Sequence, residues 1–331
     1  MKQINRRRFM KFTGLSLGIG TLYRVIPALG ADSALGGFLA DMRRSNGESM
    51  SPFTFIQLSD SHVGFNGPPN PTGTAAFERA VEVINGLPQT PELVLFTGDL
   101  THDSEDKDVH AARMAQFRKI AGGIKAPKLR FVPGEHDAGL DGGILFRENF
   151  GETHYSFDHR GIHFVGLDNV SRAKPEVGPE QLGWLRNDLA RFPRTTPIVV
   201  FTHRPLFDLK PDWEWFTSDG DDVMNTLAPY ENVTVLYGHI HRDHELDDGH
   251  IHHYAARSLI FAFPDPAVAP EKKPLPFDKE HPFKNLGLRT VADGGPKTKP
   301  QHALAVNNVE LTLREYGGAN GIQQLLRKPS F

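Results

Sequence analysis

The sequence predicts an α/β fold, and three observations support this. From residue 53 to about residue 260, apolar runs typical of strands alternate with segments in which apolar residues recur at helical spacing. Several strand-like runs, such as 91–99, are apolar at nearly every position, which is typical of strands buried on both faces of a parallel sheet. The chain has 331 residues and 39% hydrophobic content, which is enough to bury the core of one large globular domain.

The predicted strands and helices follow one another along the chain. Strands are expected at 53–60, 91–99, 128–134, 196–203 and 232–239. Helices are expected at 74–86, 106–124, 178–192 and 221–230. The first helix begins after Thr74 and ends before Gly86, and the third has Pro179 near its start, all of which are typical of helix boundaries.

The remaining segments predict β-structure and one extended connection. Residues 153–168 alternate around Arg160-Gly161 and predict a hairpin, while 247–263 predicts one or two strands. From 264 to 302 the chain is dense in proline and lysine, which favours an extended arm over the surface. The C-terminal part, 303–331, is then expected to form a β-hairpin around Asn307-Asn308, followed by a tail.

The composition excludes several classes of protein and site. The formal net charge is −3, without the basic excess of nucleic-acid-binding proteins, so we expect no nucleic-acid-binding surface. The chain contains no cysteine, which excludes disulfides, zinc–thiolate sites and cysteine-ligated iron–sulfur clusters. Its 16 histidines are many for this length, and histidine is the commonest metal ligand.

The N-terminus has the layout of an export signal. A basic start, MKQINRRRFMKF, precedes a modest apolar stretch and small residues, which predicts a signal peptide over 1–30 and a polar linker over 31–51. The apolar stretch is short and is broken by Arg24, so we expect no membrane span in the mature protein. The pair Arg6-Arg7 resembles the twin-arginine motif, which implies export in the folded state by the twin-arginine machinery to the periplasm.

Ionisable residues follow the ends of five predicted strands. Because the carboxyl ends of parallel strands lie along one edge of a sheet, we expect these side chains to share one crevice. Carboxylates gathered without partners would repel one another, and a pair of divalent cations would remove that cost. The residues are Asp60 and His62, Asp99, Glu135 with His136 and Asp137, His203, and His239 with His241.

In this order, the motifs resemble those of the calcineurin-like metallophosphoesterases. That family has D-x-H, G-D, G-N-H-D/E, H-x-P and G-H-x-H, and this chain has matching motifs between residues 60 and 241. Each motif alone is weak, but five in order at strand ends are specific. The resemblance implies a metallophosphoesterase domain over 52–263. It also implies a four-layer α/β/β/α sandwich with two central mixed sheets, beyond the α/β alternation that periodicity shows.

The resemblance also implies two metal ions, each held by carboxylate and imidazole ligands. The ligands of the first ion would be Asp60, His62 and His241. The ligands of the second would be Glu135, His203 and His239, and Asp99 would bridge both ions. Nitrogen and oxygen ligands without thiolate suit Mn, Fe, Zn or Co, among which the sequence does not choose.

His136 and Asp137 are the implied catalytic residues. The two ions would clamp the phosphoryl oxygens and lower the pKa of a water, and the resulting metal-bound hydroxide would attack phosphorus. His136 would protonate the leaving group, and Asp137 would orient the His136 ring. The implied reaction is the hydrolysis of a phosphate mono- or diester, and the sequence does not name the alcohol half of the substrate.

Glu135 departs from the family pattern, which has asparagine at this position. Glutamate can bind metal through oxygen, but when ionised it cannot donate to phosphate, and it adds a negative charge. Four interpretations follow: a trivalent ion such as Fe³⁺, a less charged substrate such as a diester, a swing of Glu135 away from the site, or weak catalysis. In the last case the protein would be a non-catalytic or weakly active metal- or ligand-binding relative.

Candidate substrate contacts come from the segment after the strand at 196–203. Arg204 could hydrogen-bond a phosphate oxygen or pair with a surface carboxylate. Trp213 and Trp215 could form a substrate wall on a loop, or pack in a small satellite core with Phe207 and Phe216. His102 and Asp103 could support the ligand histidines or lie in a polar loop. We expect the lysines of the arm, Lys272, Lys273 and Lys279, to be solvated cover and not a binding patch.

Overall fold

The computed structural model describes residues 53–293 and 304–311. The expected signal peptide, the linker and the tail lie outside these residues, so those predictions remain untested. No helix in the described ranges is long and apolar enough to cross a membrane.

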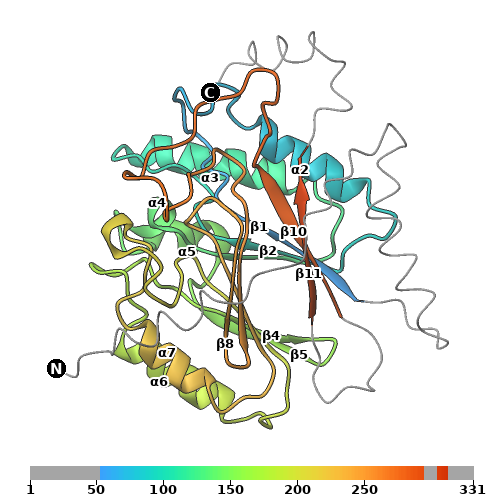
Figure 1. Ribbon diagram of the computed structural model, residues 1–331, viewed down its shortest axis with the longest axis vertical. Coiled ribbons are helices and arrows are strands. Elements are labelled where there is room, and N and C mark those ends of the chain that lie inside the picture. The colour runs from blue at the N-terminus through green and yellow to red at the C-terminus, as the bar shows by residue number, and fades with distance from the viewer. Residues whose placement is uncertain (1–52, 294–303, 312–331) are drawn as a thin grey trace. The chain divides into compact units, whose positions relative to one another are not determined.

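The core consists of two mixed β-sheets packed face to face (Figure 1). The first sheet has the order β11-β10-β1-β2-β3, and the second has the order β4-β5-β6-β7-β9-β8. The strands of the first sheet are β1 (Thr54–Leu58), β2 (Leu93–Thr97), β3 (Leu129–Val132), β10 (Gly287–Asp293) and β11 (Leu304–Glu310). Those of the second are β4 (Tyr155–His159), β5 (Ile162–Gly166), β6 (Ile198–Phe201), β7 (Val233–Tyr237), β8 (His244–Asp248) and β9 (Ile251–Ala255).

Helices cover the outer faces of both sheets, which completes the four layers that the family resemblance implies. Figure 1 shows α2 and α3 on one side of the sheets and α6 and α7 on the other. The helices are α2 (Ala75–Asn85), α3 (Lys107–Ala121), α4 (Glu135–Ala138), α5 (Ile144–Phe150), α6 (Pro179–Leu189) and α7 (Gly220–Leu227), with a 3-10 turn, η2 (Pro211–Trp213). Their apolar faces join the outward residues of the strands in two separate clusters.

The space between the sheets is filled mainly by aromatic and branched side chains. Phe55 of β1 packs edge-on against Phe164 of β5, with 5.4 Å between ring centroids. Leu95, Val199 and Leu236 extend this cluster, and all are fully buried. Each such burial stabilises the fold by roughly 1.5–3 kcal/mol. The inner cluster therefore fixes how the strand ends of the two sheets meet, and the candidate site lies at those ends.

The C-terminal strands differ from the sequence-based expectation. The arm expected over 264–302 contains β10, which pairs antiparallel with β1. The hairpin expected around Asn307-Asn308 is wrong, because these residues continue through the single strand β11 and pair with Thr290 and Arg289 of β10. A turn there would leave the outer edge of β10 unpaired, so the hydrogen bonds that this edge offers outweigh the local turn preference.

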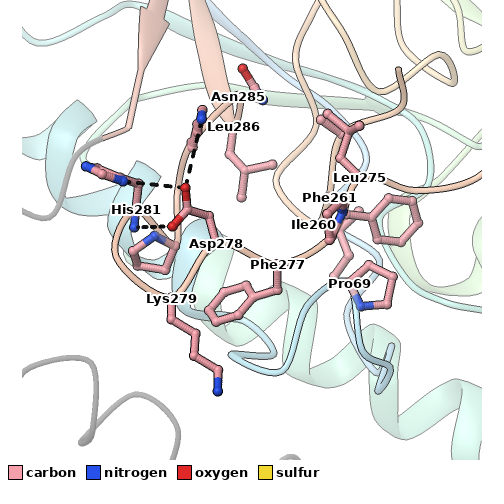
Figure 2. Close-up of a pocket in the computed structure, with 14 residues that line it drawn as sticks. Pro69, Ile260, Phe261, Leu275, Phe277, Asp278, Lys279, His281, Asn285 and Leu286 are labelled. Atoms are coloured by element: carbon pink, nitrogen blue, oxygen red, sulfur yellow. Dashed lines mark hydrogen bonds and ion pairs between the residues drawn. The ribbon is translucent and has the colours of Figure 1, made fainter. Parts of the chain in front are cut away.

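The segment before β10 encloses a cavity of about 530 Å³ together with Pro69 and residues 260–262 (Figure 2). Its walls are largely apolar, from Pro69, Phe261, Leu275 and Phe277. Asp278 accepts hydrogen bonds from the backbone N–H groups of Glu280 and His281, at 3.0 and 3.1 Å. This turn gives the otherwise extended segment a defined path along the domain.

Asp137 joins the loop after β2 to the loop after β3. Its buried carboxylate accepts hydrogen bonds from the backbone N–H groups of Leu100, Thr101 and Gly134, and from the Thr101 hydroxyl, each at 2.9 Å. Four donors satisfy the carboxylate inside the protein, where a lone charge would be costly. Asp137 therefore holds two neighbouring strand ends in register.

We expect Asp137→Ala to lower the free energy of unfolding by roughly 3 kcal/mol or more, because it leaves three buried N–H groups without an acceptor. Urea unfolding of the variant and of Asp212→Ala, at an exposed position, would measure the difference. A loss below about 1 kcal/mol, equal to that of the Asp212 variant, would contradict this structural role.

Candidate metal centre

The structure brings all seven predicted metal ligands together at the carboxyl ends of the central strands. The first cluster comprises Asp60, His62, Asp99 and His241, and the second comprises Asp99, Glu135, His203 and His239. In each cluster the possible ligand atoms lie within 4.8 Å of one another. Because Asp99 belongs to both, the geometry agrees with the bridging role that the resemblance implies.

The backbone at these positions is strained. Eight non-glycine residues in the described ranges have positive φ, and five of them are Asp60, His62, Asp99, His239 and His241. A left-handed conformation at a non-glycine residue costs of order 1–3 kcal/mol and persists only where the surroundings impose it. Here it follows the ends of β1, β2 and β7 and falls on the candidate ligands themselves. Strain concentrated at the candidate ligands points to function.

Two glycines allow the strand ends to approach closely. A Cβ at Gly134 would collide with the carboxylate of Asp99, and a Cβ at Gly238 would collide with Ser59 and approach Asp60 Oδ2 to 2.6 Å. The glycines of the G-E-H-D and G-H-x-H motifs thus make room for carboxylates that come from neighbouring strands.

Backbone carbonyls assign the histidine tautomers. His203 Nδ1 donates to Thr97 O at 2.7 Å, and His241 Nδ1 donates to Phe261 O at 2.9 Å. His239 is held the other way round, because its Nε2 donates to Glu214 O at 3.1 Å. In a neutral ring, each bond leaves the other nitrogen as a lone pair facing the cluster, as metal-binding histidines require.

The possible ligand atoms of each cluster lie close to one another. His203 Nε2 lies 2.9 Å from Glu135 Oε2, yet both atoms are buried and neither has a hydrogen-bond partner. In the first cluster, His62 Nε2 lies 3.2 Å from His241 Nε2 and 3.3 Å from an oxygen of Asp99. Nitrogen and oxygen atoms that converge in this way fit a pair of cations.

The electrostatics agree with this assignment. Burial opposes ionisation of Glu135, but His239 and His203 outweigh it and hold its pKa well below the usual range. Burial disfavours a charged His203, yet Asp99 and Glu135 raise its pKa well above the ordinary value. Burial lowers the pKa of His239 to about 4 and that of His62 well below its ordinary value. Ionised Glu135 thus faces neutral His239, which is the protonation state that metal binding needs, whereas His203 is charged in the absence of cations and would release its proton when they bind.

His136 lies beside the first cluster, but its expected partner is wrong. Asp137 bonds the backbone as described above, and the carboxylate that holds His136 Nδ1 is Asp103, at 2.5 Å. Burial opposes protonation of His136, but Asp99, Asp103 and Glu135 raise its pKa to about 9. Bound cations would screen Asp99 and Glu135 and so reduce this shift, whereas the Asp103 contact would persist.

The residues after Asp99 thus contain a functional partner that sequence reasoning left undecided. The His102 ring stacks on His136, with centroids 4.7 Å apart. The segment is therefore a polar loop, as one alternative had it, and it also supports a histidine of the site. Asp103 is polar and near the site, but it is also 37% exposed, and only its contact with His136 shows its role. Spacing within the motif could not reveal a partner from another loop.

The tryptophan wall predicted after β6 is also wrong. Trp213 and Trp215 are 5% and 0% exposed and pack with Tyr237 and Ile240. This is the alternative satellite core, and Phe207 joins it as expected. The half-buried rings beside the first cluster belong instead to Phe65 and Phe261.

Arg204 lies beside the second cluster. It is 8% exposed, its Nη1 donates to Glu214 O at 2.8 Å, and its Nη2 lies 3.5 Å from Glu135 Oε1. It therefore pairs with a candidate ligand and not with a surface carboxylate. This position is compatible with the predicted contact to phosphate.

Comparisons with known proteins agree with the geometry. A probable glycerophosphodiester phosphodiesterase from Arcobacter nitrofigilis is 26% identical over 201 residues, which cover 56% of this chain and 71% of the relative. The serine/threonine-protein phosphatase CPPED1 of Danio rerio is 27% identical over 223 residues, which cover 59% and 72%. The solved structure of a dimetal phosphatase from Danio rerio has a similar fold, with a TM-score of 0.52 and 14% identity over 78% of this chain and 99% of that one.

Residues 53–243 match the family described as calcineurin-like phosphoesterase. This range covers more than half of the chain and contains every candidate ligand. The chain therefore belongs to the calcineurin-like phosphoesterase family.

Proposed function

We propose that this protein is a metal-dependent phosphoesterase with a dinuclear centre. The observation that carries the proposal is the pair of ligand clusters that share Asp99, in each of which carboxylate oxygens and imidazole nitrogens lie within 4.8 Å of one another. Asp60, His62 and His241 would hold one cation, and the second cluster would hold the other. Bound cations would polarise the phosphoryl group and activate the attacking water.

The chain supplies an acid for the leaving group. His136 donates Nδ1–H to Asp103, so a protonated ring presents Nε2–H toward the crevice. The ring is 31% exposed, which allows a substrate oxygen to reach it. Asp103 positions the ring and favours its charged form. General acid catalysis of this kind contributes typically ~10²–10⁴-fold.

The position of Glu135 bears on one of the four interpretations of this residue. Its carboxylate lies among the ligand atoms of the second cluster, 2.7 Å from His239 Nδ1. It therefore takes the position of a ligand instead of swinging away.

The relatives include a phosphodiesterase and a phosphatase by name, so both ester types belong to the proposal.

We also propose that the protein is exported in the folded state to the periplasm. The supporting observation is the Arg6-Arg7 pair before a modest apolar stretch. A chain that carries a metal centre gains from this route, because the cations can be loaded before export.

The first prediction from this proposed function concerns metal content. Protein purified with its metals should contain two transition-metal ions per chain, and a chelator should reduce hydrolysis of a chromogenic phosphate ester by about 100-fold or more. Added Mn²⁺ should restore it. Asp99→Asn should reduce the content of both ions, whereas Asp212→Asn should not. Activity that survives complete metal removal would refute the dinuclear assignment.

The second prediction concerns proton transfer. His136→Asn should lower kcat by roughly 10²–10⁴-fold for an alkyl phosphate and much less for 4-nitrophenyl phosphate, whose leaving group needs no proton. Asp103→Asn should cause a smaller loss. Because Asp103 raises the pKa of His136, its removal should move the alkaline limb of the kcat–pH profile to lower pH. Equal losses on both esters, with an unmoved profile, would rule out this role.

The third prediction concerns export. The wild-type chain should appear in the periplasm as a shortened form that starts near residue 31. Changing both Arg6 and Arg7 to lysine should retain the full-length chain in the cytoplasm, while Arg24→Lys should not. Fractionation followed by N-terminal sequencing distinguishes these results, and unchanged export of the double variant would argue against the twin-arginine route.

A further inference from the structure

Two cations of the protein flank the second cluster, and one comes from the arm that the sequence suggested was solvated cover. Lys272 is half-buried, and its Nζ donates to Trp213 O at 3.1 Å. The same ammonium lies 5.6 Å from the centroid of the Phe263 ring. Its neighbour Lys273 is instead exposed and pairs with Glu271. Adjacent lysines thus have different environments, and only Lys272 turns toward the site.

Arg204 is the second cation. Its guanidinium is almost completely buried, and its Nε has no hydrogen-bond partner. One Nη group is used on Glu214 O, and the other lies 3.5 Å from Glu135. An unpartnered N–H on a buried charged group is costly unless a ligand supplies the acceptor.

The loop that carries both buried tryptophans holds these cations in place. Glu214 lies between Trp213 and Trp215 and has a φ of 59°, a left-handed conformation at a non-glycine residue. Its carbonyl accepts from both Arg204 and His239, while the carbonyl of Trp213 accepts from Lys272. The tryptophan core thus fixes two carbonyl groups that orient both cations and one candidate ligand.

The charges that act on Lys272 come from the metal centre. Burial lowers the pKa of Lys272 and Arg204 adds to this effect, whereas Glu135, Glu214 and Asp99 favour the charged form. Glu135 adds one negative charge where the family has a neutral asparagine. Arg204 pairs with that charge, and Lys272 adds a further positive charge. The protein itself thereby restores the positive potential that Glu135 removes, without a trivalent ion.

We propose that Arg204 and Lys272 form an anion-binding pair that holds the substrate's phosphoryl group beside Glu135 and favours phosphate monoesters over diesters. This inference rests on the proposed phosphoesterase function. A monoester has three terminal oxygens and carries up to two negative charges, whereas a diester has two such oxygens and one charge. Additional N–H donors and positive charge beside the cations therefore favour the monoester.

The test compares Lys272→Met with Lys273→Met as a matched control on the same segment, and with Lys272→Arg as a variant that keeps the charge. The first measurement is the Kd of inorganic phosphate for the Mn²⁺-loaded protein, by calorimetry. We expect Lys272→Met to weaken binding roughly 10- to 100-fold, the usual worth of a charged hydrogen bond. Lys272→Arg should recover most of the affinity, and Lys273→Met should match the wild type.

The second measurement is kcat/KM for 4-nitrophenyl phosphate and for bis(4-nitrophenyl) phosphate. Lys272→Met should lower the monoester value mainly through KM and change the diester value little. Metal content and thermal unfolding of each variant show whether the centre and the fold are intact. Unchanged phosphate affinity, or equal losses on both esters with metals retained, would overturn the inference.

The two hypotheses fail in different ways. If the wild type hydrolyses neither ester while phosphate still binds through Lys272, the proposed function fails and the anion-binding pair stands. If the wild type hydrolyses esters but Lys272→Met behaves like Lys273→Met, the pair fails and the proposed function stands.

Discussion

The main constraint on this structure is the repulsion among carboxylates that the fold collects in one buried crevice, which the rest of the molecule has to compensate. Asp60 and Asp99 are almost fully buried, and Glu135 lies beside Asp99. Bringing such charges together without compensation would cost several kcal/mol, and the left-handed backbone at the strand ends adds to that cost. Cations between the two clusters are the compensation that the donor set fits. The sandwich core, which is rich in buried aromatic residues, supplies the stability that tolerates this strain.

Asp137 was expected to orient His136, but Asp103 contacts that ring and Asp137 has a structural role. Asp137 is enclosed by backbone N–H groups and fixes the strand ends, while Asp103 reaches His136 from the loop after β2. The separation has a physical reason. A carboxylate with four donors has no free lone pair in the direction of an imidazole one residue away, whereas a partly exposed carboxylate on another loop can approach that ring.

The loop that carries Trp213 and Trp215 links packing to charge. Both tryptophans are buried in a small core, so they contribute rigidity and not a binding surface. The rigid loop directs carbonyl groups at Arg204, His239 and Lys272. Charge compensation for Glu135 therefore comes from side chains far apart in the sequence. It is an alternative to each of the interpretations that a single position suggested.

The sequence by itself determined the α/β alternation, four of the six helices in the described residues, most of the strands, and the seven candidate ligands, because periodicity and motifs at strand ends are local signals. Only the tertiary structure decided the partner of His136, the burial of Trp213 and Trp215, the single strand through Asn307-Asn308, and the turn of Lys272 toward the site. Each of these depends on a contact between segments distant in the chain. A side chain's neighbours across such a contact leave no periodic trace in its own segment.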